Sequence, residues 1–402
     1  MLGTSQVVTY ILGSFPNGIQ PFVFNELKEL SRLGFNISVF SVYGSPHHSD
    51  DEQEWISRTV YAEPLFSPKI ILSHLYFIIT KPSTYFFLLG RYRSFRGKMV
   101  FWKSAYFARE VIKRDIKHIH AHFAWVAADS ARLISKLTGI TYSLTAHQSD
   151  INRYADDNLY KKLKDAKFIF TCTKGNKEYL GNKFGKEIYN KTTSIYHGVD
   201  IEQFKPGTKN GSPNIDILSI GSLIKIKGFD HLVKACAILK SKGITHSCLI
   251  IGKGSEKEYL EELIANLNLK DTIEIKEHVP YYKISEYYYE TRIFVLPVVV
   301  IDGAPHGIPN VLAEAMSMEL PVISTNVPDI PELIENGRDG ILVDEKDPKA
   351  LADVIESLLK DNNRCMYLGK MAREKTEREF DSRQHVQRIA EKFCGAGYKM
   401  DS

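Results

Sequence analysis

Cysteine is scarce in this sequence, and its five cysteines fit no common cysteine motif. They are odd in number, lie far apart and include no Cys-x-x-Cys pair, so the sequence predicts neither a disulfide framework nor a zinc site. A reducing cytoplasm suits such cysteine usage. The five positions are Cys172, Cys236, Cys248, Cys365 and Cys394.

A secretion signal and an uninterrupted apolar run are lacking too. The opening MLGTSQVVTYILGSFP has no basic start and no small-residue cleavage site, so we expect no export by the usual route. The stretch 70–89 reaches membrane-spanning length, but His74, Lys81 and Pro82 interrupt it. A central lysine costs roughly 2.5–3.5 kcal/mol on insertion. This stretch therefore predicts a helical hairpin, either buried or lying on a membrane surface.

The 402 residues as a whole lack a strong charge or an unusual composition. They are 44% hydrophobic and 25% charged, which is typical of soluble enzymes and excludes disordered, collagen-like and coiled-coil classes. At roughly 100–200 residues per domain, the length predicts two or three domains. The net charge of +4 from 52 basic and 48 acidic residues favours no charged partner by itself.

That near-neutral total hides one basic segment. Residues 65–117 carry eleven basic residues against Glu110 and Asp115, a formal charge of +9, which leaves −5 for the rest of the chain. Aromatic residues are interleaved with the basic ones, a mixture that suits an anionic membrane surface. The alternative is a hairpin whose basic face is merely solvated. We expect this segment to bind membrane and not nucleic acid.

From Ile215 onward, short β-branched runs alternate with amphipathic helical stretches, which indicates βαβ units and a parallel sheet. Six strands with helices between them make one complete doubly wound domain. The expected strands are 215–220, 247–251, 272–275, 293–296, 322–324 and 341–343.

The first half of the chain shows the same alternation less regularly, with a helix expected over 22–33. Its expected strands are 7–12, 37–42, 119–121, 142–145 and 168–172. A stretch rich in Gly, Pro, Ser and Asn over 204–214 marks a linker. We therefore expect an acceptor-side domain over 1–205, a second domain over 206–380, and a final helix within 381–402 that is free to pack back across the linker.

Two doubly wound sheets facing each other across a cleft bind ligands at the carboxyl ends of their strands. The segment DGAPHGIPNVLAEAM follows the expected strand 293–296, and Pro309 suits the first position of a helix. A helix N-terminus there suits a diphosphate, because it presents unpaired N–H groups and the positive end of a dipole. Glu314, just over one turn on, could accept both hydroxyls of a ribose. The alternative is a tight turn with a solvated glutamate.

Two further glycine-rich turns follow other strands of this domain. In GSLIKIKGFD, Gly221 permits a close backbone approach and Lys227 adds a cation, while IIGKGSE contributes Gly252 and Gly254. One such turn is a weak signal, but several together are more specific. No Gly-x-Gly-x-x-Gly with an acidic residue about twenty positions on follows a first strand, which disfavours a nicotinamide dehydrogenase.

Histidines mark two strands of the first domain. His147 follows a strand in LTAHQSDI and could reach a polar ligand, although a single histidine is more often structural. His120 and His122 share one face of a strand because side chains alternate. They could bind a metal, but no cysteine or carboxylate lies nearby in the sequence, so we expect packing and hydrogen bonding.

The chain resembles the retaining glycosyltransferases of family 4, which have the GT-B fold, and in particular the branch that builds bacterial exopolysaccharide and capsule. The likeness rests on FPNGIQPFVFNEL, HIHAHFAWVAADSA, SLTAHQSDI, IYHGVDIEQFKP, IGSLIKIKGFDHLVKAC, IIGKGSE, and the run from FVLPVVV to DGILV. These segments span residues 6–380 in the family's order and spacing.

The resemblance implies a site for a nucleotide-sugar donor. Glu314 matches the family's ribose-binding glutamate, Lys227 its diphosphate-binding lysine and His147 its histidine near the donor sugar, which makes these three the implied catalytic residues. The implied donor-binding set is Gly221, Ser222, Lys227, Gly252, His278, Val279, His306, Gly307, Ile308, Pro309, Asn310, Val311 and Glu314. The implied acceptor-side set is Phe15, Pro16, Asn17, Gly18, His120 and His147.

Three positions depart from the family pattern. His306 stands where the family has the glutamate that touches the transferred sugar, Ser222 replaces an arginine, and Glu319 replaces a usual glycine. Losing one charge-assisted contact costs roughly 1.5–3 kcal/mol, or about ten- to a hundredfold in binding or rate. A second hypothesis therefore stays open, a catalytically weak GT-B protein that serves as a partner subunit.

The function implied by the resemblance is sugar transfer from a nucleotide sugar to a glycan or lipid-linked glycan, with retention at the anomeric carbon. UDP-sugars are the first expectation for the donor and GDP-mannose the second. No cofactor and no metal are expected, because helix termini and a lysine would neutralise the diphosphate. We expect a cytoplasmic enzyme held at the inner face of the cytoplasmic membrane by residues 65–117.

Overall fold

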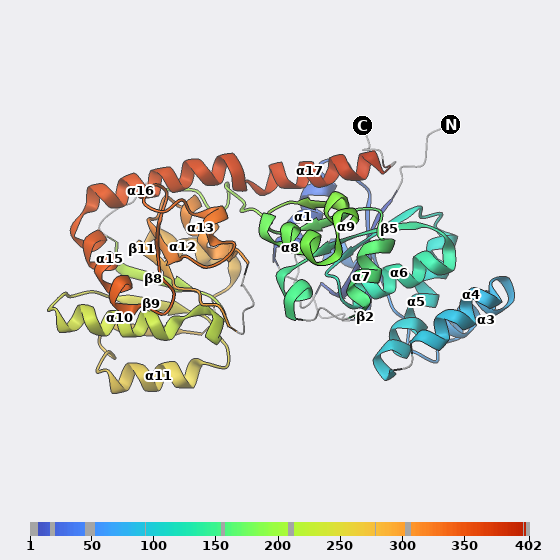
Figure 1. Cartoon of the computed structure of the whole chain (residues 1–402), viewed down its shortest axis with the longest axis horizontal. Coiled ribbons are helices and arrows are strands. Elements are labelled where there is room, and N and C mark those ends of the chain that lie inside the picture. The colour runs from blue at the N-terminus through green and yellow to red at the C-terminus, as the bar shows by residue number, and fades with distance from the viewer. Residues whose placement is uncertain are drawn as a thin grey trace. The chain divides into compact units, whose positions relative to one another are not determined.

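The chain forms two compact units, shown in Figure 1. Unit 1 comprises Met1–Ile195 and Val386–Ser402, and unit 2 comprises Tyr196–His385. This computed structural model describes residues 7–16, 21–44, 53–92, 94–153, 157–207, 213–277, 279–301, 307–396 and 398.

Unit 1 is built on a parallel sheet of seven strands in the order β3-β2-β1-β4-β5-β6-β7. The strands are β1 (Val8–Phe15), β2 (Ile37–Gly44), β3 (Thr59–Tyr61), β4 (His118–His122), β5 (Thr141–Ala146), β6 (Ile169–Thr171) and β7 (Thr192–Ser194). The five expected strands are confirmed. The sequence missed β3 and β7, because three residues are too few to show a period of two.

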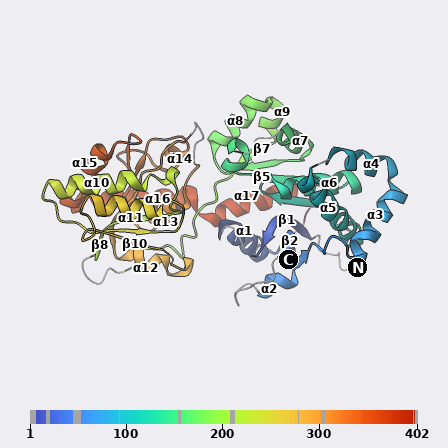
Figure 2. The ribbon, with the colours of Figure 1, turned by 90° about the horizontal axis from the view of Figure 1, so that it is seen from below.

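Helices cover both faces of this sheet (Figure 2). They are α1 (Pro21–Arg32), α2 (Gln53–Ser57), α3 (Pro68–Thr80), α4 (Pro82–Arg91), α5 (Phe95–Lys113), α6 (Val126–Thr138), α7 (Asp157–Asp165), α8 (Lys174–Phe184), α9 (Lys186–Lys191) and the greater part of α17 (Ser382–Gly395). One apolar cluster joins the sheet to α3, α5 and α6. A second joins it to α1 and α17, with Phe393 of α17 fully buried.

Unit 2 is built on a parallel sheet of six strands in the order β10-β9-β8-β11-β12-β13. The strands are β8 (Ile215–Ile220), β9 (Cys248–Ile251), β10 (Ile273–Lys276), β11 (Thr291–Leu296), β12 (Val322–Thr325) and β13 (Ile341–Val343), all within two residues of expectation. Its helices are α10 (Phe229–Ser241), α11 (Lys257–Asn266), α12 (Ile284–Tyr289), α13 (Asn310–Ser317), α14 (Ile330–Leu333), α15 (Pro348–Lys360) and α16 (Asn362–Lys375). The chain order reverses between β8 and β11, where doubly wound sheets bind ligands.

Unit 2 begins at Tyr196, before the expected boundary at residue 206. The segment ahead of that boundary belongs to unit 2 because Phe204 is fully buried there and Arg373 donates to its carbonyl oxygen at 2.8 Å. The last helix, α17, also differs from the expected division at residue 381. Its first residues lie in unit 2, whereas those from Val386 onward belong to unit 1.

The stretch 70–89 forms two helices instead of one span. Helix α3 ends at Thr80 and α4 starts at Pro82, so the chain breaks at Lys81 as expected. In the described part of the chain, we find no helix that combines the length and the apolar character needed to cross a membrane.

Glu319 has a left-handed backbone, with φ of 56°, and it follows the last turn of α13. This is the position after a helix where glycine is commonest, because glycine has no Cβ to clash there. The departure at residue 319 therefore replaces a glycine by a residue that bears backbone strain.

We predict that Glu319→Gly stabilises the protein. Removing the Cβ relieves about 1–2 kcal/mol of strain, of which the added freedom of the unfolded glycine cancels about 0.5–1 kcal/mol. A rise in melting temperature checks this prediction. Glu319→Ala, which keeps the Cβ, is the matched control and should show no such rise; equal melting temperatures for both variants would contradict the explanation.

Candidate active site

Three turns meet at the carboxyl ends of β8, β9 and β11 in unit 2. The Gly221 N–H donates to the Ile251 carbonyl at 3.0 Å, which joins the turns after β8 and β9. The Val299 N–H donates to the Ile226 carbonyl at 3.0 Å, which ties the segment after β11 to the turn after β8. These backbone bonds place the turn around Lys227 beside the start of the segment that leads from β11 to the helix bearing Glu314.

Glycine is required at two points where these turns touch. A Cβ on Gly252 would lie 1.8 Å from the Gly221 carbonyl oxygen. Gly228 has φ of 67°, and a Cβ there would lie 1.9 Å from the Pro297 carbonyl oxygen. The turns therefore approach one another through backbone alone, as a phosphate-binding crevice needs.

Lys227 is a buried cation in the turn after β8. It lies in a 3₁₀ turn over Lys225–Lys227, and only 8% of it is exposed. Burial lowers the pKa of its ammonium group to about 8, so the group is still largely charged at neutral pH. Among the described residues, no carboxylate pairs with its Nζ. A buried charge without a counter-charge is costly, so this position favours an anionic ligand.

Glu314 is buried on α13 and held by two tyrosines. The Tyr288 hydroxyl donates to Glu314 Oε2 at 3.0 Å, and the Tyr281 hydroxyl donates to Oε1 at 3.2 Å. Burial raises the pKa of Glu314 to about 7, although both hydrogen bonds oppose the rise. Neither tyrosine was predicted from the sequence. The run YYKISEYYYE could have indicated them, because a buried tyrosine hydroxyl usually hydrogen-bonds to a polar partner.

Helix α13 begins at Asn310, so Pro309 is its N-cap. The sequence had predicted Pro309 as the first residue of the helix, which is one position after the N-cap. The preceding Gly307 has φ of 76°, which turns the chain into the helix. The first N–H groups of a helix have no partner within it and suit an anion. Of the other implied donor residues, Ile308, Val311 and Val279 are half-buried and Ser222 is exposed, whereas His278 and His306 lie outside the described residues.

In unit 1, His147 follows β5 and packs between aromatic rings. Its ring stacks on Phe123 at 4.1 Å and lies 5.5 Å from Phe22, while its Nδ1 is 3.3 Å from Cys172 Sγ. Asp150 Oδ2 accepts the N–H groups of His147 and of the residue after Phe123, each at 2.9 Å. Burial raises the pKa of Asp150 to about 6. The carboxylate fixes the turn and hence the direction of the imidazole.

His120 lies inside the sheet of unit 1. Its Nδ1 bonds to Ser143 Oγ at 2.8 Å and its Nε2 to Thr145 Oγ1 at 3.0 Å. Glu26 is far from His120 and His122 in the sequence, but in the fold its Oε1 lies 3.8 Å from His122 Nδ1. These two histidines and Glu26 bring one possible metal ligand each within 4.8 Å of one another. A metal would have to displace the bonds that His120 makes to β5.

The remaining acceptor-side residues lie at the end of β1. Phe15 is fully buried, and its ring is 6.4 Å from that of Trp55, so its side chain belongs to the core. Pro16 is also buried, and the Phe15–Pro16 peptide bond is cis. Asn17 and Gly18 lie outside the described residues.

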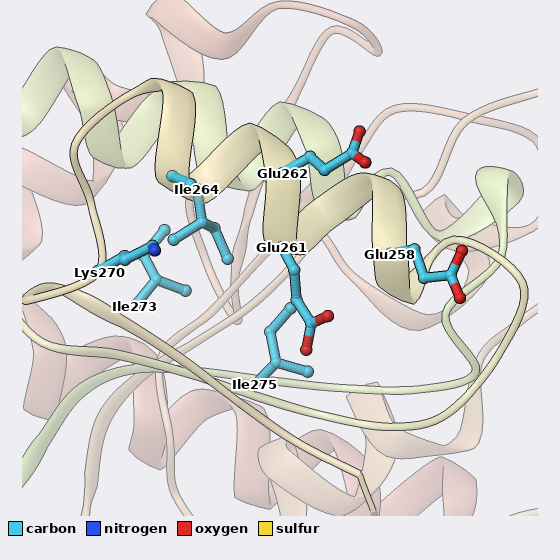
Figure 3. A pocket seen from close by; sticks show the side chains of 8 residues that line it. Glu258, Glu261, Glu262, Ile264, Lys270, Ile273 and Ile275 are labelled. Atoms are coloured by element: carbon cyan, nitrogen blue, oxygen red, sulfur yellow. The ribbon is translucent and has the colours of Figure 1, made fainter.

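A hollow on the outer edge of unit 2 lies between α11 and β10 (Figure 3). It is lined by Glu258, Glu261, Glu262, Ile264, Ala265, Lys270, Ile273 and Ile275. Three carboxylates against one lysine would repel a diphosphate, and none of the implied donor residues lines this hollow. The turns at the β8–β11 switch point, with Lys227 and the start of α13, are therefore the candidate site.

We predict that Glu314→Gln removes one source of pH-dependent stability. Burial raises the pKa of Glu314 to about 7 in the folded protein, whereas an unfolded glutamate loses its proton near its ordinary pKa of 4.5. Ionising this carboxyl between pH 5 and 8 therefore destabilises the fold, by up to about 3 kcal/mol. The variant should gain melting temperature over the wild type at pH 8 but not at pH 5. The exposed Glu319→Gln is the control, and an equal difference at both pH values would refute the assignment.

Two family models match the chain, one on each half. The model described as Glycosyltransferase Family 4 matches residues 16–203, and the model described as Glycosyl transferases group 1 matches residues 200–375. Residues 16–375 are thus matched by glycosyltransferase models, and the second match contains both Lys227 and Glu314.

Two relatives take part in polysaccharide biosynthesis by their names. The amylovoran biosynthesis glycosyltransferase AmsK of Erwinia amylovora is 27% identical over 96% of this chain and 98% of its own length. The putative colanic acid biosynthesis glycosyltransferase WcaL of Escherichia coli K12 is 34% identical over 46% of each chain.

Solved glycosyltransferases share the fold. The sucrose-phosphate synthase of Thermosynechococcus elongatus matches 97% of this chain and 99% of its own, with a TM-score of 0.73 and 19% identity. The HepE protein of Anabaena, solved with UDP and glucose, matches 97% of this chain and all of its own, with a TM-score of 0.73 and 17% identity. The two parallel α/β units, the paired family models and these relatives together show that the chain belongs to the family 4 glycosyltransferases with the GT-B fold.

Proposed function

We propose that this glycosyltransferase of polysaccharide biosynthesis transfers sugar from a nucleotide-sugar donor, with retention, to a glycan or lipid-linked glycan. The observation that carries the proposal is the presence of two buried charged groups in unit 2, one in the turn after β8 and one on the helix that follows β11. Lys227 supplies a cation for a diphosphate, and Glu314 supplies a carboxylate for a ribose. A nucleoside diphosphate has both parts.

The diphosphate is the leaving group in this reaction. The bond between the anomeric carbon and the phosphate oxygen breaks, and the acceptor hydroxyl attacks the same face of the sugar. Negative charge accumulates on the departing phosphate, where Lys227 and the first N–H groups of α13 would stabilise it. The departing phosphate can take the acceptor proton, and no protein nucleophile is assigned.

Glu314 would bind the ribose without losing its tyrosines. Each carboxylate oxygen has two acceptor positions, and the hydroxyls of Tyr281 and Tyr288 each take one. Ribose hydroxyls can take the others. The two tyrosines thus act as positioning residues that hold the carboxylate while a ligand binds.

The finer identity of the substrates rests on likeness and chemistry. A UDP-sugar is the favoured donor, which the UDP bound to the HepE structure supports, and GDP-mannose is the second choice. The reaction is proposed to need no metal or cofactor, because Lys227 and the start of α13 would neutralise the diphosphate. His147 would contact the donor sugar. The acceptor is proposed to be presented at the inner face of the cytoplasmic membrane.

We predict that Lys227→Ala reduces kcat/KM for nucleotide release by about a hundredfold or more, as loss of one charge-stabilising donor does in other enzymes. Glu314→Ala should have a comparable effect through lost ribose binding. Lys225→Ala removes an exposed lysine from the same turn and is the matched control. Release of UDP or GDP from a panel of nucleotide sugars, with a lipid-linked acceptor extract, measures all three. Turnover near that of the wild type in both site variants would refute the site.

The second candidate function is that of a partner subunit with little activity. Ser222 and His306, which stand where the family has an arginine and a glutamate, favour it. Nucleotide binding separates the two candidates. We predict that UDP raises the melting temperature of the wild type, and that Lys227→Ala shows a much smaller rise. The absence of a rise with both UDP and GDP would favour the partner subunit.

A further inference from the structure

Helix α3 has an apolar side that faces solvent. Four of its residues, one or two turns apart, point away from unit 1, with exposed fractions of 45%, 63%, 48% and 77%. They are Ile71, Leu72, Leu75 and Ile79. Four exposed branched apolar residues on one helix side are unusual for a surface in water, where helices place charged residues.

Two polar residues in the middle of α3 lie on its buried side. Ser73 and His74 are both 4% exposed. His74 Nδ1 bonds to the Tyr85 hydroxyl at 2.8 Å, and its Nε2 lies 3.2 Å from the Trp102 carbonyl oxygen. These contacts join α3 to α4 and α5, so the apolar side is held outward by specific polar bonds.

Exposed phenylalanines extend the apolar surface to the neighbouring segments. Phe86 and Phe87 on α4 are 56% and 59% exposed. Phe66, just before α3, and Phe95, at the start of α5, are more than 80% exposed. Figures 1 and 2 both show α3 and α4 at the margin of unit 1. We call Phe66, Ile71, Leu72, Leu75, Ile79, Phe86, Phe87 and Phe95 the apolar face.

The charges around the apolar face are mainly positive, and the one carboxylate beside α3, Glu63, pairs with Lys69. The sequence has no Asp or Glu between Glu63 and Glu110. Four exposed cations of this stretch form no ion pair with any described residue, and the Arg91 guanidinium lies 4.5 Å from the Phe87 ring centre. The four are Lys81, Arg91, Arg96 and Lys98.

Other basic residues of the segment 65–117 are engaged within unit 1. Lys103 Nζ donates to the Val42 carbonyl at 2.8 Å, and the Arg109 guanidinium lies 3.9 Å from the Tyr76 ring centre. Lys113 and Arg114 pair with Glu110. The basic surface is therefore narrower than the sequence total of +9 indicated. The four unpaired cations lie between α3 and α4, on α4 and on α5, whereas Lys69 of α3 pairs with Glu63 at 2.6 Å.

We propose that the α3–α4 hairpin inserts the apolar face into the headgroup region of an anionic bilayer, with the helices lying in the membrane plane. An apolar side with a rim of mostly unpaired cations matches that environment, where acyl chains meet lipid phosphates. The proposal extends the proposed membrane location, because it replaces electrostatic attachment by shallow insertion. Insertion can be tested independently of the donor and acceptor, because neither Lys227 nor Glu314 belongs to the apolar face.

Vesicle sedimentation of the full chain tests the proposal without any nucleotide sugar. Wild-type protein should pellet with phosphatidylglycerol vesicles and much less with phosphatidylcholine vesicles. The double variant Leu72→Gln/Ile79→Gln should bind the anionic vesicles at least about tenfold more weakly, since two apolar side chains leave the lipid. Met366→Gln/Tyr367→Gln removes two exposed apolar residues of α16 and should bind like the wild type. Unchanged melting temperatures confirm that the variants are folded.

A depth probe separates insertion from surface attachment. The variant Ile79→Trp should be quenched by brominated acyl chains in phosphatidylglycerol vesicles, and a tryptophan at Met366 should not. Equal vesicle binding by wild type and Leu72→Gln/Ile79→Gln, or no quenching at position 79, would overturn insertion. A dimer in solution that Leu72→Gln/Ile79→Gln disperses, with no vesicle binding, would assign the face to a second copy of the chain. Nucleotide release by the soluble variants is scored separately, so the two proposals can fail independently.

Discussion

The candidate site depends on the close approach of three backbone turns at the end of the β8–β11 pair. Parallel strands place their carboxyl ends at one edge, but side chains would normally keep the turns apart. Gly228 and Gly252 remove that obstacle, because a Cβ on either would lie less than 2 Å from a carbonyl oxygen. Lys227 is buried because these turns close around it. In the proposed function, the diphosphate of the donor would balance its charge, so the packing that buries the lysine would also favour an anionic ligand.

Glu314 is buried like Lys227, but it has hydrogen-bond partners within the protein. Its carboxyl is buried as deeply as the ammonium of Lys227, yet two tyrosine hydroxyls already hydrogen-bond to it. Burial raises the pKa of Glu314 and lowers that of Lys227, so in the free protein each group is less charged than it would be in water. A bound nucleotide would restore both charges, because a diphosphate favours the ammonium and ribose hydroxyls favour the carboxylate. Affinity and protonation are therefore linked at this site.

Unit 2 was predictable from sequence because its buried parallel strands are continuous β-branched runs, and its motifs follow those strands directly. The strands β3 and β7 were not, because they are only three residues long. Long-range partners were also hidden. Tyr281 and Tyr288 reach Glu314 only after the chain after β10 turns back, and Glu26 reaches the β4 histidines across the sheet. The spacing of residues in a sequence predicts the structure of a single helix or strand. Contacts between residues of different elements depend on the topology of the whole unit, which spacing alone does not give.

The basic segment shows how folding changes the meaning of a charge count. Eleven cations in 65–117 suggested one continuous basic surface. In the folded unit, carbonyl oxygens, aromatic rings and Glu110 engage several of them, whereas the apolar side of α3 becomes exposed. Long-range attraction to a membrane falls off within about 8 Å at physiological salt, so the remaining cations could orient the protein but would hold it weakly. In the proposed insertion, the exposed branched side chains of α3 would supply the short-range, salt-insensitive contribution that charge lacks. Cations would bring the enzyme to the surface, and apolar contacts would lengthen its stay beside the proposed lipid-linked acceptor.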